Sequence, residues 1–143
     1  MLSEKVIKFL ETDEDTIKLS ESTVSKYLNV LNKYALKSDS VVELMSKYLG
    51  EFYGKEGHIL NLAQDLSKYE ESATYHLRNH DNISEKYFSL FDTETEDYLL
   101  YNKEDDSVKL IEAPNMKELS NDDYQDRKWN SFNAFLEEFF DLN

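Results

Sequence analysis

The sequence predicts an α+β fold in which N-terminal helices precede a small antiparallel sheet and a C-terminal helix closes the structure. Apolar residues recur at three- and four-residue steps in the first 50 residues and again in the last 15. Residues 87–111 instead combine two-residue alternation with aliphatic and aromatic runs, as strands do. A chain of 143 residues with 40% hydrophobic residues can bury one core, so we expect a single domain over residues 1–143.

Three helices are predicted in the first 52 residues. Ser3 suits the cap of a first helix that runs to about Leu10. A second helix begins near residues 20–22, and its apolar positions are Val24, Tyr27, Leu28, Leu31, Tyr34 and Ala35. A third helix follows the polar break at residues 37–40, and its apolar positions are Val41, Leu44, Met45, Tyr48, Leu49 and Phe52.

The region between the third helix and the sheet is less regular. Gly50, Gly54 and Gly57 lie close together and predict a helix exit followed by a loop with unusual backbone angles. No Lys-Ser or Lys-Thr pair follows these glycines, so a phosphate-binding loop is not favoured. A short strand at residues 58–62 and a helix or irregular helical segment at residues 63–77 come next.

Three strands form the predicted sheet, at residues 87–91, 98–101 and 108–111. Acidic turns at residues 92–97 and 102–107 join them, and the second is polar throughout, as a hairpin loop should be. After Pro114 we expect a polar loop with a short turn up to residue 128. The closing helix has a broad aromatic stripe, formed by Trp129, Phe132, Phe135, Leu136, Phe139 and Phe140.

The net charge is −14, and most of it lies in the last third of the chain. Residues 1–91 carry 15 acids and 11 bases, whereas residues 92–143 carry 15 acids and 5 bases. An acidic surface repels nucleic acid and lipid headgroups and attracts basic partners. With only two arginines, direct binding to nucleic acid is not expected, and neither is binding to a membrane.

The sequence also bears on the compartment. There are no cysteines, which excludes disulfides and thiolate metal sites and is consistent with a reducing interior. The first ten residues do not have the pattern of a secretory signal, and no apolar run has the length of a membrane-spanning helix. We therefore expect a soluble cytoplasmic protein.

No catalytic constellation is evident, so an enzyme is not expected. His76 and His80 are four residues apart and could share a zinc ion, with His58, Glu70, Glu71 or Asp81 as a third ligand. Their position near a helix end is explained equally well by histidines that favour a helix C-terminus, so we predict no metal or cofactor and leave the pair open. The acidic clusters lack the ligand spacing of an EF-hand loop and are typical of a solvated surface.

Several segments resemble the SUKH superfamily, which includes bacterial immunity proteins and fungal cell-wall regulators. The resemblance rests on the helix and loop at residues 41–62, the Tyr-x-x-Tyr-Asn hairpin strand at residues 98–102 followed by Val108, and the Ser-Phe-x-x-Phe-Leu segment at residues 131–136. It implies a single SUKH-like α+β domain. It carries over no catalytic residues, because the bacterial members of this superfamily act by binding and blocking a cognate toxin.

The leading hypothesis is therefore an immunity protein that neutralises a bacterial toxin with a basic surface, such as a nuclease or another effector that targets nucleic acid. We expect the contact on the two acidic turns, at Asp92, Glu94, Glu96, Asp97, Glu104, Asp105 and Asp106. The alternative is a nucleic-acid mimic from a phage or mobile element that inhibits a host DNA-binding enzyme. A mimic would bind several unrelated basic proteins instead of one.

Overall fold

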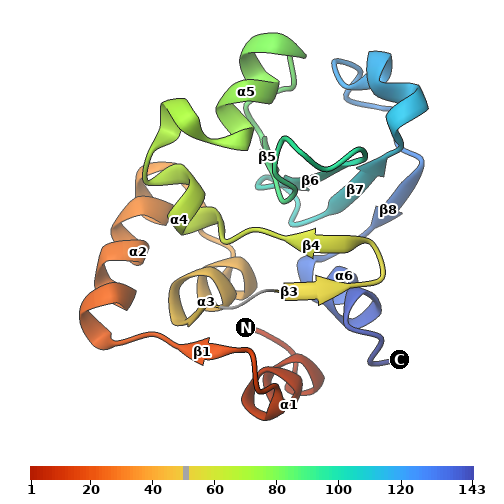
Figure 1. Ribbon diagram of the computed structural model, residues 1–143. Helices are drawn as coiled ribbons and strands as arrows, with labels where there is room; N and C mark the ends of the chain where they lie inside the picture. The colour runs from red at the N-terminus through yellow and green to blue at the C-terminus, as the bar shows by residue number, and fades with distance from the viewer. Residues whose placement is uncertain (50–51) are drawn as a thin grey trace.

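The computed structural model describes residues 1–49 and 52–143 and confirms the predicted α+β class (Figure 1). The helices are α1 (Glu4–Thr12), α2 (Glu21–Lys33), α3 (Asp39–Lys47), α4 (Leu62–Leu66), α5 (Ala73–His80) and α6 (Phe132–Phe139), with the 3₁₀ helices η1 (Tyr69–Glu71) and η2 (Ala113–Glu118). The strands are β1 (Ile17–Lys18), β2 (Tyr48–Leu49), β3 (Phe52–Gly54), β4 (Gly57–Ile59), β5 (Tyr87–Ser89), β6 (Tyr98–Asn102), β7 (Val108–Ile111) and β8 (Arg127–Trp129).

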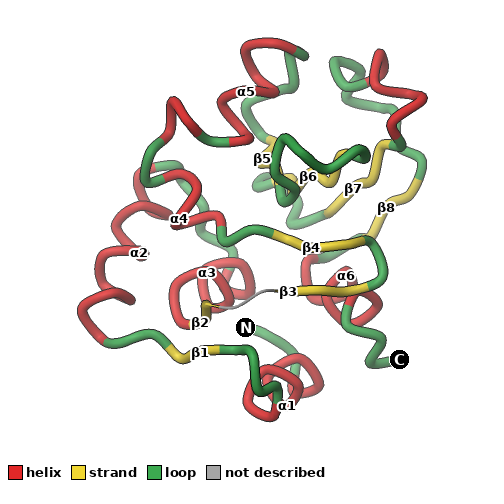
Figure 2. The backbone as a smooth tube through the Cα atoms, viewed as in Figure 1, coloured by secondary structure: helices red, strands yellow, loops and turns green. Residues whose placement is uncertain are grey.

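The main sheet is antiparallel, with the strand order β5-β6-β7-β8 (Figure 2). Its register pairs Leu99 with Leu110 on one face and Leu100 with Lys109 on the other. Two short antiparallel ribbons, β1-β2 and β3-β4, lie outside this sheet. All three strands predicted for this sheet are present, although β5 ends at Ser89 and not at residue 91. The short strand predicted at residues 58–62 corresponds to β4, which ends at Ile59.

Both faces of the main sheet are covered. One face packs on the larger core, which the aromatic residues of α6 share with residues of α1, α3 and α4. The other face lies under α5 and η2, and a smaller cluster fills this side: Leu77, Ile83, Tyr87, Leu100, Ile111 and Leu119. Because the sheet is buried on both faces, β7 is buried at every position and does not alternate between polar and apolar residues.

Serine residues begin several helices, as the sequence predicted for Ser3. The side-chain oxygen of Ser3 accepts a hydrogen bond from the backbone N–H of Val6, and Ser20 accepts one from Thr23. Ser131 does the same for Ala134 at the start of α6. These bonds satisfy backbone donors that have no partner within the first turn of a helix.

The third predicted helix is too long. α3 ends at Lys47, and Tyr48 has extended backbone angles, φ −126° and ψ 142°. Tyr48 lies in β2 and pairs with Lys18 of β1, while Phe52 begins β3. Alternation in a strand and spacing in a helix place Tyr48 and Phe52 on a buried side equally well, so the apolar pattern could not locate the helix end. Gly50, one of the three glycines predicted to form a helix exit and a loop, lies outside the described residues.

Two further boundaries differ from the prediction. Trp129 belongs to β8 and not to the closing helix, because Ser131 caps a helix that starts at Phe132. This fourth strand falls within the segment predicted as a loop, and its Arg127 and Lys128 are exposed. The segment at residues 63–77, predicted as a helix or an irregular helical segment, is irregular: it is divided into α4, η1 and α5, because Ser72 takes extended angles and caps α5, which continues to His80.

The β3-β4 ribbon lies directly against α6. A Cβ atom added at Gly54 would collide with the backbone carbonyl oxygen of Phe139 and lie 2.6 Å from its Cγ. The neighbouring Lys55 N–H donates to the same carbonyl oxygen at 3.0 Å. Gly54 is therefore needed for close approach, whereas Gly57 supplies a positive φ of 123° at the turn.

Candidate functional site: the acidic turns of the sheet

The two predicted acidic turns do not form one surface. The turn at residues 92–97 precedes β6, and the turn at residues 103–107 follows it, so the two lie at opposite ends of this strand. A five-residue strand separates them by roughly 15 Å. The seven predicted contact residues therefore fall into two groups with different surroundings.

The β5-β6 turn is held in shape by two of its own aspartates. Asp92 Oδ1 accepts hydrogen bonds from the backbone N–H groups of Glu94 at 2.9 Å and Thr95 at 3.1 Å. Asp97 Oδ1 accepts a bond from the N–H of Ala113 at 2.9 Å. Glu94 and Glu96 are exposed. Two carboxylates thus fix the turn while two others face the solvent.

A small cavity of about 70 Å³ lies between this turn and α5. Its charged and titratable lining residues are Asp81, Asp92, Asp97, His76 and Tyr98, and no lysine or arginine lines it among the described residues. The remaining lining residues include Phe91, Leu77 and Thr95. The lining of this cavity is therefore mainly negatively charged. The cavity is large enough for a single side chain and too small for a whole ligand.

The β6-β7 turn is different, because its Asp106 is part of the internal structure. Asp106 Oδ1 accepts hydrogen bonds from Ser38 Oγ at 2.7 Å and from the Tyr101 hydroxyl at 2.8 Å, and Oδ2 accepts one from the N–H of Phe132 at 3.3 Å. Its backbone φ is 65°. Asp106 thus joins the starts of α3 and α6 to β6, and little of its carboxylate is left for a partner.

Lysines surround the rest of this turn. Asp105 Oδ1 accepts bonds from the Ser107 N–H and hydroxyl, and these bonds, with the charges of Lys128 and Lys86, outweigh burial and lower the pKa of Asp105. Glu104 is exposed. The local charge is therefore mixed, and this end of the sheet is less acidic than the sequence of the turn alone indicated.

Lys109 was missed by sequence reasoning. It is only 4% exposed, and its Nζ donates to the carbonyl oxygens of Asp122 at 3.3 Å and Tyr124 at 3.1 Å, with the ring of Tyr87 4.4 Å away. Burial lowers the pKa of this lysine. A lysine between the apolar residues of a strand predicts a side chain that faces the solvent. Lys109 is internal only because the loop at residues 119–126 covers this face of the sheet.

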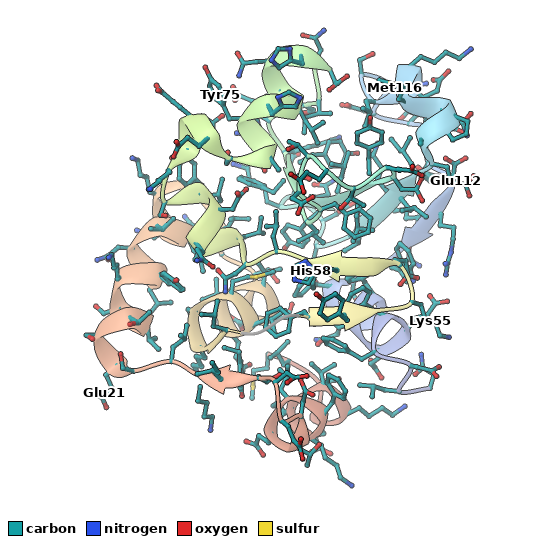
Figure 3. The ribbon with its side chains drawn as sticks, viewed as in Figure 1. Glu21, Lys55, His58, Tyr75, Glu112 and Met116 are labelled. Atoms are coloured by element: carbon teal, nitrogen blue, oxygen red, sulfur yellow. The ribbon has the colours of Figure 1, made fainter. Side chains whose placement is uncertain are left out.

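Among the described residues, the histidines do not converge with a third metal ligand. The rings of His76 and His80 lie 4.4 Å apart on α5, which ends at His80, three residues beyond the end predicted for the helical segment at residues 63–77. The ring of His58, on β4, lies 4.8 Å from the ring of Tyr53. Figure 3 shows His58 well separated from Tyr75 of α5, the helix that carries the other two histidines. Within residues 1–49 and 52–143, no group of three or more His, Asp or Glu side chains is arranged to hold a metal ion.

None of the helices in the described part of the chain is long and apolar enough to cross a membrane. Comparison of the chain with protein-family models, with curated proteins and with solved structures gave no match.

Proposed function

We propose that this protein is an immunity protein that binds and neutralises a cognate bacterial toxin through its acidic surface. The observation that carries the proposal is the acidic β5-β6 turn beside a cavity lined by Asp81, Asp92 and Asp97. The resemblance of residues 98–102 and 131–136 to SUKH proteins agrees with it. No catalytic role is assigned to any residue.

Electrostatics supports a basic partner. A toxin that acts on nucleic acid holds phosphate groups with lysine and arginine, and an acidic protein can occupy the same surface. The net charge of −10 over residues 92–143 would accelerate the encounter through long-range attraction. Such steering raises association rates by roughly 10–1000-fold at low ionic strength.

The surroundings of the two turns favour the β5-β6 turn as the proposed contact. Glu94 and Glu96 are exposed on a turn that Asp92 holds in shape, so they can meet a partner at little entropic cost. The cavity beside them suits the ammonium or guanidinium group of one partner side chain, since its lining offers carboxylates and a tyrosine. Asp106 and Asp105 have internal hydrogen-bond partners and are weaker candidates for contact.

The acidity also fits the alternative, a nucleic-acid mimic from a phage or mobile element. A mimic has to present charges along a path that follows a phosphate backbone, whereas the proposed contact is one turn and one small cavity lined by Asp81, Asp92 and Asp97. A contact of this size favours a single partner with a matched basic side chain.

The test begins with the product of the gene adjacent to this one in the host genome. We expect that product to stop growth when expressed alone and to be rescued by co-expression of this protein in a stoichiometric complex. The double variant Glu94→Lys/Glu96→Lys should lose the rescue. The double variant Glu14→Lys/Asp15→Lys changes the net charge equally on another exposed loop and should retain it.

Three outcomes would count against the proposal. A harmless neighbour would remove the immunity role, and tight binding of several unrelated DNA-binding enzymes in its place would support the mimic. Equal loss of rescue in both double variants would mean that net charge alone matters and that the β5-β6 turn is not the contact.

A further inference from the structure

The tip of the β3-β4 ribbon is attached to the rest of the molecule through two neighbouring residues. Lys55, which Figure 3 shows at this tip, donates its backbone N–H to the carbonyl oxygen of Phe139 at 3.0 Å, and its Nζ lies 3.1 Å from Asp141 Oδ1. Glu56 Oε1 accepts a hydrogen bond from Nη1 of Arg127 on β8 at 3.2 Å. One backbone contact and two charged contacts therefore hold the tip of the ribbon.

Glu56 is the enclosed member of this group. Only 5% of its side chain is exposed, whereas 45% of the Arg127 side chain is exposed. Glu56 Oε1 faces Arg127, but Oε2 is buried and has no hydrogen-bond partner among the described residues. A carboxylate that leaves water without gaining donors for both oxygens is unfavourable in its charged form.

Arg127 compensates Glu56 only in part, because a second carboxylate shares its guanidinium group. Arg127 Nη2 donates to Glu138 Oε1 on α6 at 2.6 Å, a shorter bond than the 3.2 Å bond to Glu56. Glu138 Oε2 also accepts a hydrogen bond from Trp129 Nε1. Both oxygens of Glu138 are therefore satisfied, whereas one oxygen of Glu56 is not.

The two carboxyl groups consequently differ in how readily they hold a proton. Burial raises the pKa of Glu56 and the charge of Glu138 adds to this effect, while Arg127, the Glu56 backbone N–H and Lys55 act in the opposite direction. The hydrogen bond from Trp129 and the bond and charge of Arg127 lower the pKa of Glu138 in spite of burial. As the pH falls, Glu56 therefore takes up a proton before Glu138 does.

We infer that Glu56 is a proton-dependent attachment point of the β3-β4 ribbon: when its enclosed carboxylate takes up a proton, the contact of the ribbon with β8 and α6 becomes stronger, and when the proton leaves, the contact becomes weaker. Protonation removes the charge with the unsatisfied oxygen and leaves Arg127 paired with Glu138 alone.

The direction of the pH dependence follows from linkage. Detachment of the ribbon returns Glu56 to water, where the charged carboxylate is favoured and the proton is held less tightly. The attached ribbon therefore binds the proton more strongly than the detached ribbon, so the contact gains stability as the pH falls and loses it as the pH rises through the range in which Glu56 titrates. This inference does not depend on the proposed function.

The test is hydrogen exchange of the Lys55 amide, which reports the opening of its bond to Phe139. After correction for the intrinsic exchange rate, we expect the equilibrium constant for opening to fall at least about twofold between about pH 8 and pH 5 in the parent protein. Glu56→Gln keeps the shape of the side chain without its titrating proton, so the fall should be absent. Glu14→Gln removes the same charge from an exposed loop and should behave as the parent does.

A second measurement needs no variant. Carboxyl-carbon chemical shifts of the parent protein report the titration of each glutamate, and we expect Glu56 to take up its proton at a higher pH than Glu138. Titration of Glu56 at or below the pH at which Glu138 titrates would overturn the inference. The same conclusion would follow if the pH dependence of Lys55 exchange were equal in the Glu56 and Glu14 variants.

Discussion

Asp106 shows how one residue can join elements that are distant in the chain. Its carboxylate receives donors from the start of α3, from β6 and from the start of α6. The sequence presents it as one of several acids in a hairpin turn, without a local signal that separates it from Glu104 or Asp105. Only the tertiary arrangement gives it a structural role.

We expect Asp106→Ala to lower the free energy of unfolding by about 2–4 kcal/mol, because three donors lose an ionised acceptor and alanine tolerates a φ of 65° poorly. Asp106→Asn should cost less, since asparagine accepts hydrogen bonds and adopts positive φ more readily. Glu104→Ala is the control and should change stability by less than about 0.5 kcal/mol. Urea unfolding measures all three, and equal effects at positions 104 and 106 would contradict the structural role.

Tyr101 should make the fold sensitive to alkaline pH. Burial and its hydrogen bond to Asp106 raise the pKa of Tyr101, and a hydrogen bond to Asp126 raises the pKa of Tyr124 to about 12. Above pH 10 the unfolded chain therefore loses protons that the folded protein keeps, and stability falls as pH rises. Below about pH 10.5, Lys109 acts in the opposite direction, because burial lowers its pKa.

The measurement is urea unfolding between pH 10.5 and 12 for the parent protein and Tyr101→Phe. We expect the variant to lose stability less steeply, by about 1.4 kcal/mol per pH unit at most, since phenylalanine has no proton to lose. Parallel profiles over this range would show that Tyr101 keeps its ordinary pKa in the folded protein.

At the scale of elements, the contact between the β3-β4 ribbon and α6 depends on Gly54. We expect Gly54→Ala to destabilise the protein by more than about 2 kcal/mol, because the added methyl group would collide with the backbone of Phe139, which cannot move without shifting α6. Thermal unfolding measures the loss. The additional variant Phe139→Leu removes the ring but not the backbone collision, so it should not rescue Gly54→Ala.

The elements that could be predicted from the sequence are those with a local signal. Ser3 caps a helix and α2 begins within residues 20–22 as expected, and β7 has the predicted bounds of 108–111. The end of α3 could not be predicted, because Tyr48 is buried in either a helix or a strand. β8 was missed because it is short and its Arg127 and Lys128 are exposed, and only pairing with β7 makes it a strand.

The candidate site was predictable only in part. The exposure of Glu94 and Glu96 follows from a polar turn between two strands, which the sequence contains. The cavity beside them depends on α5 packing over β5, where the Thr74 hydroxyl accepts a hydrogen bond from the backbone N–H of Ser89 at 2.9 Å. That hydrogen bond joins residues 15 positions apart in the sequence, so the periodic pattern of apolar residues could not predict it.

On the scale of the whole molecule, charge is distributed unevenly in space. The turn at residues 92–97 is acidic, the β6-β7 end of the sheet carries Lys86 and Lys128 beside its acids, and α2 exposes Lys26 and Lys33 along with Glu21. The net charge of −14 would not show this separation.

The most direct test of the proposed function is the affinity for the adjacent gene product, measured by isothermal titration calorimetry at about 50 and 300 mM salt. We expect Glu94→Lys/Glu96→Lys to weaken binding at least about 100-fold at low salt, and Glu14→Lys/Asp15→Lys to weaken it less than about fivefold. The difference between the two variants should shrink at high salt. Equal affinities for the two double variants at both salt concentrations would contradict a contact at the β5-β6 turn.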